Sequence, residues 1–259
     1  MRIALGIEYN GAAYCGWQYQ DHSPSVQERV EHALAHVADH NIRVICSGRT
    51  DTGVHAYCQV VHFDTTANRS EHSWAFGANT KLPGDISILW AKHVDESFHA
   101  RFSAVSRVYR YVLLNRKIRP GLLRDRVSWE YRPLDLQQMQ TATRHLIGEH
   151  DFTSYRAVAC QASSPVRTLK RIEISQSGEL FTLELEANGF LHHMVRNIAG
   201  VLITIGAGEA EPGWAKEVLD KRDRTQGGLT APPDGLYFVG PCYPEEFEIP
   251  SLLPTDAVW

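Results

Sequence analysis

The sequence lacks the patterns that mark secreted, membrane-spanning and zinc-binding proteins. Its five cysteines are odd in number and widely spaced, and no two of them form a CxxC pair. This use of cysteine is typical of free thiols in a reducing compartment. No uninterrupted apolar run approaches the length that spans a bilayer, and the first residues alternate like a strand, unlike a signal peptide. We therefore expect a cytoplasmic protein with no membrane partner.

An excess of positive charge is also missing. With 26 basic and 30 acidic residues, the formal net charge is −4, which argues against an indiscriminate nucleic-acid binder. The basic residues are nevertheless concentrated, because eight of them lie between Arg101 and Arg126 with only Asp125 opposing them. Aromatic residues are interleaved with these arginines. The combination is typical of a local surface that holds phosphates and bases, and a solvated charged face is the alternative.

Hydrophobic periodicity predicts both strands and helices. Apolar alternation predicts strands over 3–9, 44–46, 60–64, 86–94, 108–114, 171–175 and 180–187. Helical spacing predicts helices from Ser25 onward and over 73–79, 135–147, 191–205 and 212–219. Because the strands come in pairs as well as alternating with helices, we expect an α+β protein with largely antiparallel sheet.

Two of these helices carry a capping signal. Ser25 with Glu28, and Asp135 with Gln138, have the spacing of a capping box. The first helix also places His32, His36 and His40 four residues apart, a spacing that suits a metal. No carboxylate or cysteine accompanies them, so we prefer a solvated face to a zinc site.

The most distinctive segment runs from Ser47 to Ala56, with the sequence SGRTDTGVHA. It places one carboxylate, Asp51, two residues after Arg49 and between two glycines, with a β-rich run on each side. Glycine permits the close approaches that a ligand-gripping loop needs, and loops between strands often carry reactive groups. A hairpin with charged tips is the alternative, and local chemistry alone leaves both open.

Further motifs, in a fixed order, support the first interpretation. The segment resembles the active-site motif of the TruA family of tRNA pseudouridine synthases. Other matching segments are 9–11, 14–18, 25–28, 79–83, 98–104, 107–111, 190–197, 230–232 and 235–236. The resemblance covers the chain from about residue 3 to about residue 240.

The resemblance implies a fold of two similar α/β halves. Their largely antiparallel sheets are expected to join into one extended sheet, with an active-site cleft between the halves. We expect an N-terminal half over 1–105 that carries the Asp51 loop and a C-terminal half over 106–240. Residues 241–259 are expected to form an extension that packs loosely or is disordered. Members of the family are homodimers, so the resemblance also implies a homodimer.

The implied activity is isomerisation of uridine to pseudouridine in the anticodon stem-loop of tRNA, at positions 38, 39 or 40. The reaction breaks the C1′–N1 bond and rejoins the base through C5. It needs no cofactor, and the sequence has no phosphate loop, dinucleotide fingerprint or zinc spacing. Asp51 matches the family's essential aspartate, which either attacks the sugar or removes a sugar proton; the sequence leaves both routes open.

Two further catalytic residues are implied by the family motifs. Arg196 matches a basic residue that should pair with Asp51 when the halves close, because arginine keeps its charge and grips a carboxylate bidentately. Tyr109 matches a tyrosine whose ring stacks on uracil and whose hydroxyl serves in removal of the C5 proton.

The candidate substrate-binding residues are less distinctive. Leu236 matches an apolar residue of the family's pocket, and Arg49 is expected to hold a phosphate or to help extrude the base from its stem. The other candidate RNA contacts are His55, Arg101, Arg107 and Arg110. For His192 and His193 we prefer packing or RNA contact to a metal.

Two other functions stay open. A non-catalytic tRNA-binding or tRNA-folding protein could keep the same fold, but it has no reason to keep Asp51, Tyr109 and Arg196 together. A nucleoside hydrolase would need a second carboxylate or a metal to activate water, and neither is placed near Asp51 in the sequence.

Overall fold

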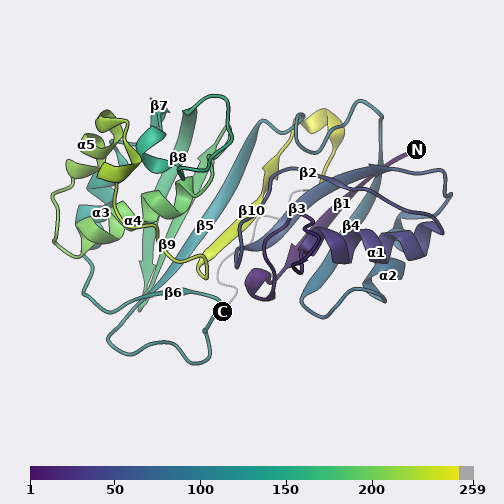
Figure 1. Cartoon of the computed structure of the whole chain (residues 1–259), viewed down its shortest axis with the longest axis horizontal. Helices are drawn as coiled ribbons and strands as arrows, with labels where there is room; N and C mark the ends of the chain where they lie inside the picture. The colour runs from purple at the N-terminus through teal and green to yellow at the C-terminus, as the bar shows by residue number, and fades with distance from the viewer. Residues whose placement is uncertain (251–259) are drawn as a thin grey trace. The chain divides into compact units, whose positions relative to one another are not determined.

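The computed structural model describes residues 1–250, which form two compact units (Figure 1). Unit 1 contains Met1–Ser106 together with the chain from Tyr237 onward, and unit 2 contains Arg107–Leu236. Each unit combines a sheet with helices, which confirms the α+β class. The last part of the expected extension, 251–259, lies outside the described residues.

The sheet of unit 1 is mainly antiparallel. Its strand order is β4-β1-β3-β10, with β2 paired to β3. β1 is antiparallel to both neighbours, whereas β10 runs parallel to β3. The bounds are β1 Arg2–Tyr9, β2 Ile45–Cys46, β3 His55–Asp64, β4 Ile86–Val94 and β10 Leu236–Cys242.

Both faces of this sheet are covered. Helices α1 (Val26–Ala38) and α2 (Glu71–Asn79) cover one face (Figure 1), where the Trp74 ring meets the Phe63 ring at 5.2 Å between centroids. The side chains that alternate to the other face, among them those of Ala4 and Val60, pack against Phe98. Because both faces are covered, nearly all residues of β1 and β3 are buried or half-buried.

The described part of the C-terminal extension packs firmly, contrary to the expectation of loose packing. The rings of Tyr243 and Phe247 meet Phe98 edge-on, at 5.1 and 5.3 Å between centroids. The Tyr243 hydroxyl donates to the Ala100 carbonyl at 2.6 Å. Aromatic residues are the reason, because each one buries a large apolar area despite the acidic residues beside it.

The sheet of unit 2 has the order β5-β9-β8-β7, and all three pairs are antiparallel. A short strand, β6, runs parallel to β5. The strand bounds are β5 Ser106–Asn115, β6 Ser128–Glu130, β7 Gly148–Asp151, β8 Val166–Ser177 and β9 Leu180–Ala187. The helices are α3 Leu136–Thr143, α4 Met194–Gly206 and α5 Trp214–Lys221.

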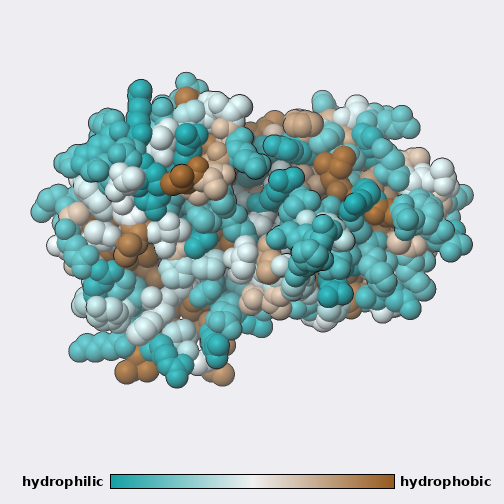
Figure 2. Space-filling view, in the orientation of Figure 1, coloured by the Kyte–Doolittle hydropathy of each residue, from teal (hydrophilic) through white to brown (hydrophobic). Residues whose placement is uncertain are grey.

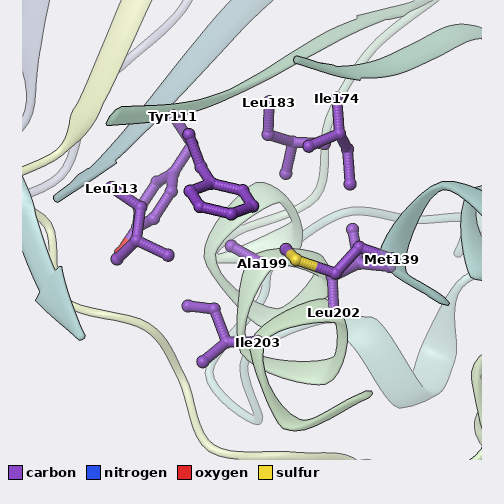
Figure 3. Close-up of a pocket in the computed structure, with 9 residues that line it drawn as sticks. Tyr111, Leu113, Met139, Ile174, Leu183, Ala199, Leu202 and Ile203 are labelled. Carbon is purple, nitrogen blue, oxygen red and sulfur yellow. The ribbon is translucent and has the colours of Figure 1, made fainter. Parts of the chain in front are cut away.

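Helices α3 and α4 pack on one face of this sheet. Between them lies a cavity of about 10 Å³, lined by side chains of β5, β8, β9, α3 and α4 (Figure 3). A cavity of that size is at the lower limit for one water molecule. The lining is apolar apart from Tyr111, whose hydroxyl donates to Ser128 Oγ at 2.6 Å. We interpret it as a packing gap in the core, not as a substrate site.

Several sequence-based predictions are confirmed. The strands predicted over 3–9, 86–94 and 180–187 are present within one residue at each end. Both caps form, since Glu28 N donates to Ser25 Oγ at 3.3 Å and Gln138 N donates to Asp135 Oδ1 at 3.1 Å. Gly178, with φ of 58°, lies in the turn between β8 and β9, which correspond to the strands predicted over 171–175 and 180–187.

Other boundaries were wrong. The helix predicted over 135–147 ends at Thr143, and Gly148 begins a strand with φ of 109°. The helix predicted from residue 191 begins at Met194, because His193 takes a left-handed conformation with φ of 61°. His40 lies beyond the end of α1, so the three histidines do not share one helix. Strands β6, β7 and β10 were not predicted.

The surface is mainly hydrophilic on the face shown in Figure 2, where hydrophobic residues form small separate groups. Within residues 1–250, no helix combines the length and the apolar character that crossing a membrane requires. All five cysteines are free thiols.

We predict that the stability of the protein falls in mild acid because of His62. Burial, together with the nearby His99 and Arg2, lowers the pKa of His62 from 6.5 to about 4. Below pH 6.5 the His62 imidazole takes up a proton in the unfolded chain, whereas in the folded chain it stays neutral down to about pH 4. The free energy of unfolding should therefore decrease by about 2 kcal/mol between pH 6.5 and pH 4, allowing for partial screening by solvent.

Urea unfolding at pH 7.5 and pH 5 measures this effect. His62→Asn is the control, because Asn Oδ1 can accept the hydrogen bond that His62 Nδ1 accepts from Ala100 N at 3.1 Å. An equal pH dependence in both proteins would show that His62 is not responsible.

Candidate active site

The loop over 47–54, which we call the Asp51 loop, precedes β3 in unit 1. Asp51 is half-buried and Arg49 is exposed. Val54 N donates to the Asp51 carbonyl at 3.1 Å, and Gly53 has φ of 79°, so the chain turns tightly just after the carboxylate. Glycine is required there because other residues rarely adopt a positive φ. The start of the loop is held by Gln59, whose Oε1 accepts from Ser47 Oγ at 2.7 Å.

The segment over 9–17 packs against the backbone of this loop and holds it in place. Trp17 N donates to the Thr50 carbonyl at 3.1 Å. A Cβ on Gly16 would lie 2.6 Å from the Thr50 oxygen, and one on Gly11 would lie 2.0 Å from the Val54 oxygen. Both glycines therefore allow a backbone-to-backbone approach that any other residue would prevent. This packing explains why these two N-terminal motifs accompany the aspartate motif in the sequence.

A buried hydrogen bond also holds this loop in place. The hydroxyls of Tyr9 and Thr50 lie 2.7 Å apart, and Thr50 directly precedes Asp51. Burial raises the pKa of Tyr9 above its usual range, so its hydroxyl stays protonated and available for this bond. Sequence analysis did not single out Tyr9 or Thr50, although both lie in matched motifs.

We predict that Tyr9→Phe and Thr50→Val are coupled. Each substitution removes this hydrogen bond from the buried hydroxyl that remains, and should lower the free energy of unfolding by about 1–2 kcal/mol. The double variant leaves neither hydroxyl, so its cost should be clearly less than the sum of the two. Urea unfolding of the four proteins measures the coupling, and strictly additive costs would contradict the bond.

His55 is buried in the same unit. It is 2% exposed, and its Nδ1 accepts from Gly11 N at 3.0 Å. Its ring stacks on Tyr237 with centroids 4.7 Å apart. These contacts give His55 a role in supporting the loop, and contact with RNA would require this packing to change. Its role as an RNA contact stays a prediction.

In unit 2, Tyr109 lies within β5 and Arg196 lies near the start of α4. Tyr109 is half-buried on β5, and its ring meets Phe190 edge-on at 4.9 Å between centroids. Arg196 lies in the first turn of α4, and its Nε donates to the Ala231 carbonyl at 2.8 Å. This bond uses one donor of the guanidinium and fixes the direction of the side chain.

The first turn of α4 is held by a polar network that sequence analysis missed. Asn197 is buried, and its Oδ1 accepts from Thr230 Oγ1 at 2.7 Å and from Arg224 Nη2 at 3.1 Å. Arg224 Nη1 also donates to the Gly228 carbonyl at 3.0 Å. The loop that accepts the Arg196 hydrogen bond is therefore ordered by Arg224. Only the neighbouring Asn197 and Thr230 lay in matched motifs.

Leu236 is buried, with 4% of its surface exposed. Gly235 before it packs against the backbone, because a Cβ there would lie 2.2 Å from the Val112 carbonyl oxygen. This close contact therefore requires glycine at position 235. A contact of Leu236 with substrate stays a prediction.

The arginines proposed as RNA contacts differ in their surroundings. Arg110 forms an ion pair with Glu184 at 2.9 Å, and Glu184 also binds Arg171 at 2.6 Å. Arg107 Nη1 donates to the Asn188 carbonyl at 3.1 Å. Arg101 is exposed and lies over the Phe102 ring, 5.5 Å from its centroid. Among these, Arg101 has the surroundings that best suit an RNA contact, and all three roles stay predictions.

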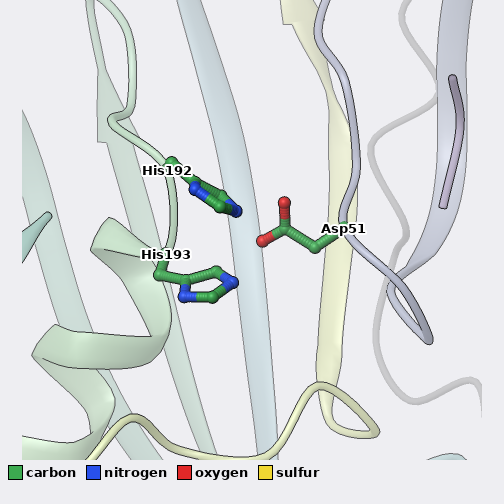
Figure 4. A group of neighbouring side chains, drawn as sticks. All are labelled: Asp51, His192 and His193. Atoms are coloured by element: carbon green, nitrogen blue, oxygen red, sulfur yellow. The ribbon is translucent and has the colours of Figure 1, made fainter. Parts of the chain in front are cut away.

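Figure 4 shows Asp51 on its loop in unit 1, and His192 and His193 just before α4 in unit 2. The two imidazole rings lie 4.0 Å apart between centroids. Two imidazoles alone are an incomplete ligand set for zinc, which takes four ligands in structural sites. Packing or RNA contact stays our prediction for this pair.

Comparison with known proteins connects these features. A family model described as tRNA pseudouridine synthase matches residues 6–103 and 142–244. The chain is 57% identical over 251 residues to "tRNA pseudouridine synthase A" of Coxiella burnetii, covering 97% of this chain and 96% of that protein. It is 56% identical to the protein of that name from Pseudomonas aeruginosa, over 96% of this chain and 88% of the relative. The protein of that name from Hydrogenovibrio crunogenus is 50% identical, over 99% and 98%. The chain belongs to the tRNA pseudouridine synthase family.

Proposed function

We propose that this protein isomerises uridine to pseudouridine in the anticodon stem-loop of tRNA, at positions 38, 39 or 40, with Asp51 as the essential carboxylate. Membership of the family makes it a tRNA pseudouridine synthase, which is an isomerase. The positions and the role of Asp51 are our proposal.

One observation carries the assignment of Asp51. It is a half-buried carboxylate on a turn whose backbone is fixed from behind by Gly11, Gly16 and Trp17. A catalytic group acts well when its surroundings hold it in place before the substrate arrives. A charged hairpin tip, the alternative considered from sequence, would not need such bracing.

The chemistry assigns a distinct task to each residue. The Asp51 carboxylate attacks C1′ of the ribose or removes a sugar proton, and the C1′–N1 bond breaks. The released uracil turns, and its C5 bonds to C1′ while the bond between Asp51 and C1′ breaks or, on the other route, while Asp51 returns the proton to the sugar. The C5 proton then leaves, with the Tyr109 hydroxyl serving in that transfer, and N1 gains a proton. Atoms balance without a redox partner, and no water is consumed.

Arg196 is proposed to supply the positive charge that keeps Asp51 ionised. A carboxylate removed from water loses its charge unless a cation or hydrogen bonds stabilise it. The guanidinium cannot deprotonate, and its planar fork can hold a carboxylate bidentately. The proposal requires residues of both units to act on one uridine.

The remaining assignments concern the substrate. Arg49 is proposed to hold a phosphate or extrude the base, and Leu236 to line the pocket for uracil. Arg101, Arg107 and Arg110 are proposed to contact RNA, and His55 to do so if its packing changes.

By the same resemblance, we propose a homodimer that works in the cytoplasm. The free cysteines accord with a reducing compartment.

Mapping of pseudouridine tests the positions. An unmodified tRNA transcript with uridines at 38, 39 and 40 is incubated with the enzyme, and pseudouridine is located by carbodiimide labelling and primer extension. We expect stops at one or more of the three positions. Stops elsewhere in the tRNA would contradict the positions but not the activity. Tight tRNA binding with no product would favour a tRNA-binding protein.

A further inference from the structure

The turn over 99–103 in unit 1 presents an aromatic ring to solvent. Phe102 is 76% exposed, and its ring stacks on His99 with centroids 4.4 Å apart and planes 29° apart. The guanidinium of Arg101 lies 5.5 Å from the same ring centroid. Single exposed hydrophobic residues are common and need no explanation. An exposed ring combined with a stacked imidazole and a guanidinium is a more specific arrangement.

The turn holds this ring in a fixed position. His99 Nδ1 accepts from the backbone N–H groups of Arg101 and Phe102, both at 3.2 Å. Ala100 is held at both ends, because its N–H donates to His62 Nδ1 at 3.1 Å and its carbonyl accepts from Tyr243 at 2.6 Å. A rigid aromatic residue loses little conformational freedom when a ligand stacks on it.

One arginine of this turn and one of the Asp51 loop act on the same thiol, that of Cys46. Burial raises the pKa of the Cys46 thiol to about 11, and Arg49 and Arg101 both oppose that rise. Both guanidinium groups are therefore close enough to Cys46 to act on it. Cys46 is the last residue of β2, directly before the Asp51 loop. The Phe102 ring itself has one positive charge beside it, that of Arg101.

We propose that Phe102 and Arg101 form a subsite for one unpaired nucleotide of the RNA substrate, with the base stacked on the Phe102 ring and the phosphate held by Arg101. Base–aromatic stacking and arginine–phosphate contacts are the two interactions by which proteins hold unpaired nucleotides. The subsite depends on the proposed function in one respect, namely that the RNA it binds is tRNA. It contributes affinity and does no chemistry.

Equilibrium binding of tRNA transcript by the full chain tests the subsite. Phe102→Ala should raise the Kd about tenfold with little change in its salt dependence. Phe102→Leu keeps an apolar side chain without a ring face and should show a similar loss. Arg101→Ala should raise the Kd and also lower the slope of log Kd against log salt by about one.

Phe76→Ala is the matched control. Phe76 is 65% exposed in the same unit, and its ring also stacks on a histidine, His72, at 5.3 Å between centroids. No arginine is placed over it among the cation–ring contacts of residues 1–250. We expect tRNA affinity within twofold of wild type for this variant. Phe102 variants that bind tRNA as well as Phe76→Ala would overturn the subsite and point to a protein partner.

Failure of the subsite and failure of the proposed function give different results. If the wild type forms pseudouridine but Phe102→Ala and Phe102→Leu bind tRNA normally, only the subsite is wrong. If the wild type forms no pseudouridine but both variants lose affinity, the subsite stands and the catalytic assignment is wrong.

Discussion

Asp51→Asn should abolish pseudouridine formation while leaving the protein folded and able to bind tRNA. The amide has the size of the carboxylate but is neither a nucleophile nor a base. Loss of a group that takes part directly in bond-making costs on the order of 10⁴-fold or more in turnover. The turn should survive, because its hydrogen bond joins Val54 N to the backbone carbonyl of residue 51.

Single-turnover kinetics, tRNA affinity and the unfolding midpoint are measured together for this variant. Asp39→Asn is the matched control: it makes the same chemical change at the end of α1, where φ of 60° suits asparagine. The control should match wild type in all three measurements. Substantial turnover by Asp51→Asn would refute the role of Asp51, whereas unfolding of that variant alone would assign it a structural role.

Arg196→Ala should damage turnover far more than tRNA binding. Removal of a charge that stabilises a reacting group costs on the order of 100-fold in kcat. The variant also loses the bond to the Ala231 carbonyl, at a cost of about 1 kcal/mol in folding stability. KM and the tRNA Kd should change less than threefold, because in this account the guanidinium serves Asp51 and not the RNA backbone.

Two further variants separate charge from geometry. Arg196→Lys keeps the positive charge but not the planar fork, and should recover only part of the lost activity. Arg144→Ala removes the same charge from an exposed position in unit 2 and should leave kcat unchanged. Equal losses in kcat and in tRNA affinity for Arg196→Ala would make Arg196 an RNA contact.

Local signals in the sequence predicted much of the fold. Ser25 and Asp135 cap helices as expected, because a cap depends on residues three positions apart. Long alternating strands such as β9 were also predictable. Strand β10 was not, because its seven residues include Gly240 and Pro241 and it is stabilised by pairing with β3, more than 170 residues earlier.

For the candidate site too, residues in local motifs could be predicted, whereas contacts between distant residues could not. Asp51, Tyr109 and Arg196 could be proposed from the sequence because each lies in a distinctive motif. The groups that hold them were missed, because a Tyr9–Thr50 hydrogen bond or an Arg224–Asn197 contact joins residues that have no fixed spacing. The start of α4 was also misplaced, since nothing in its apolar sequence signals the left-handed conformation of His193.

The central claim is that the protein uses Asp51 to replace the C1′–N1 bond of uridine by a C1′–C5 bond, which releases the hydrogen at C5. The most direct measurement is tritium release from a tRNA transcript that carries 5-tritiated uridine, with wild type and Asp51→Asn compared at equal tRNA saturation. The account predicts release by the wild type and none above background by the variant. Equal release by both proteins, or tRNA binding by the wild type without any release, would contradict it.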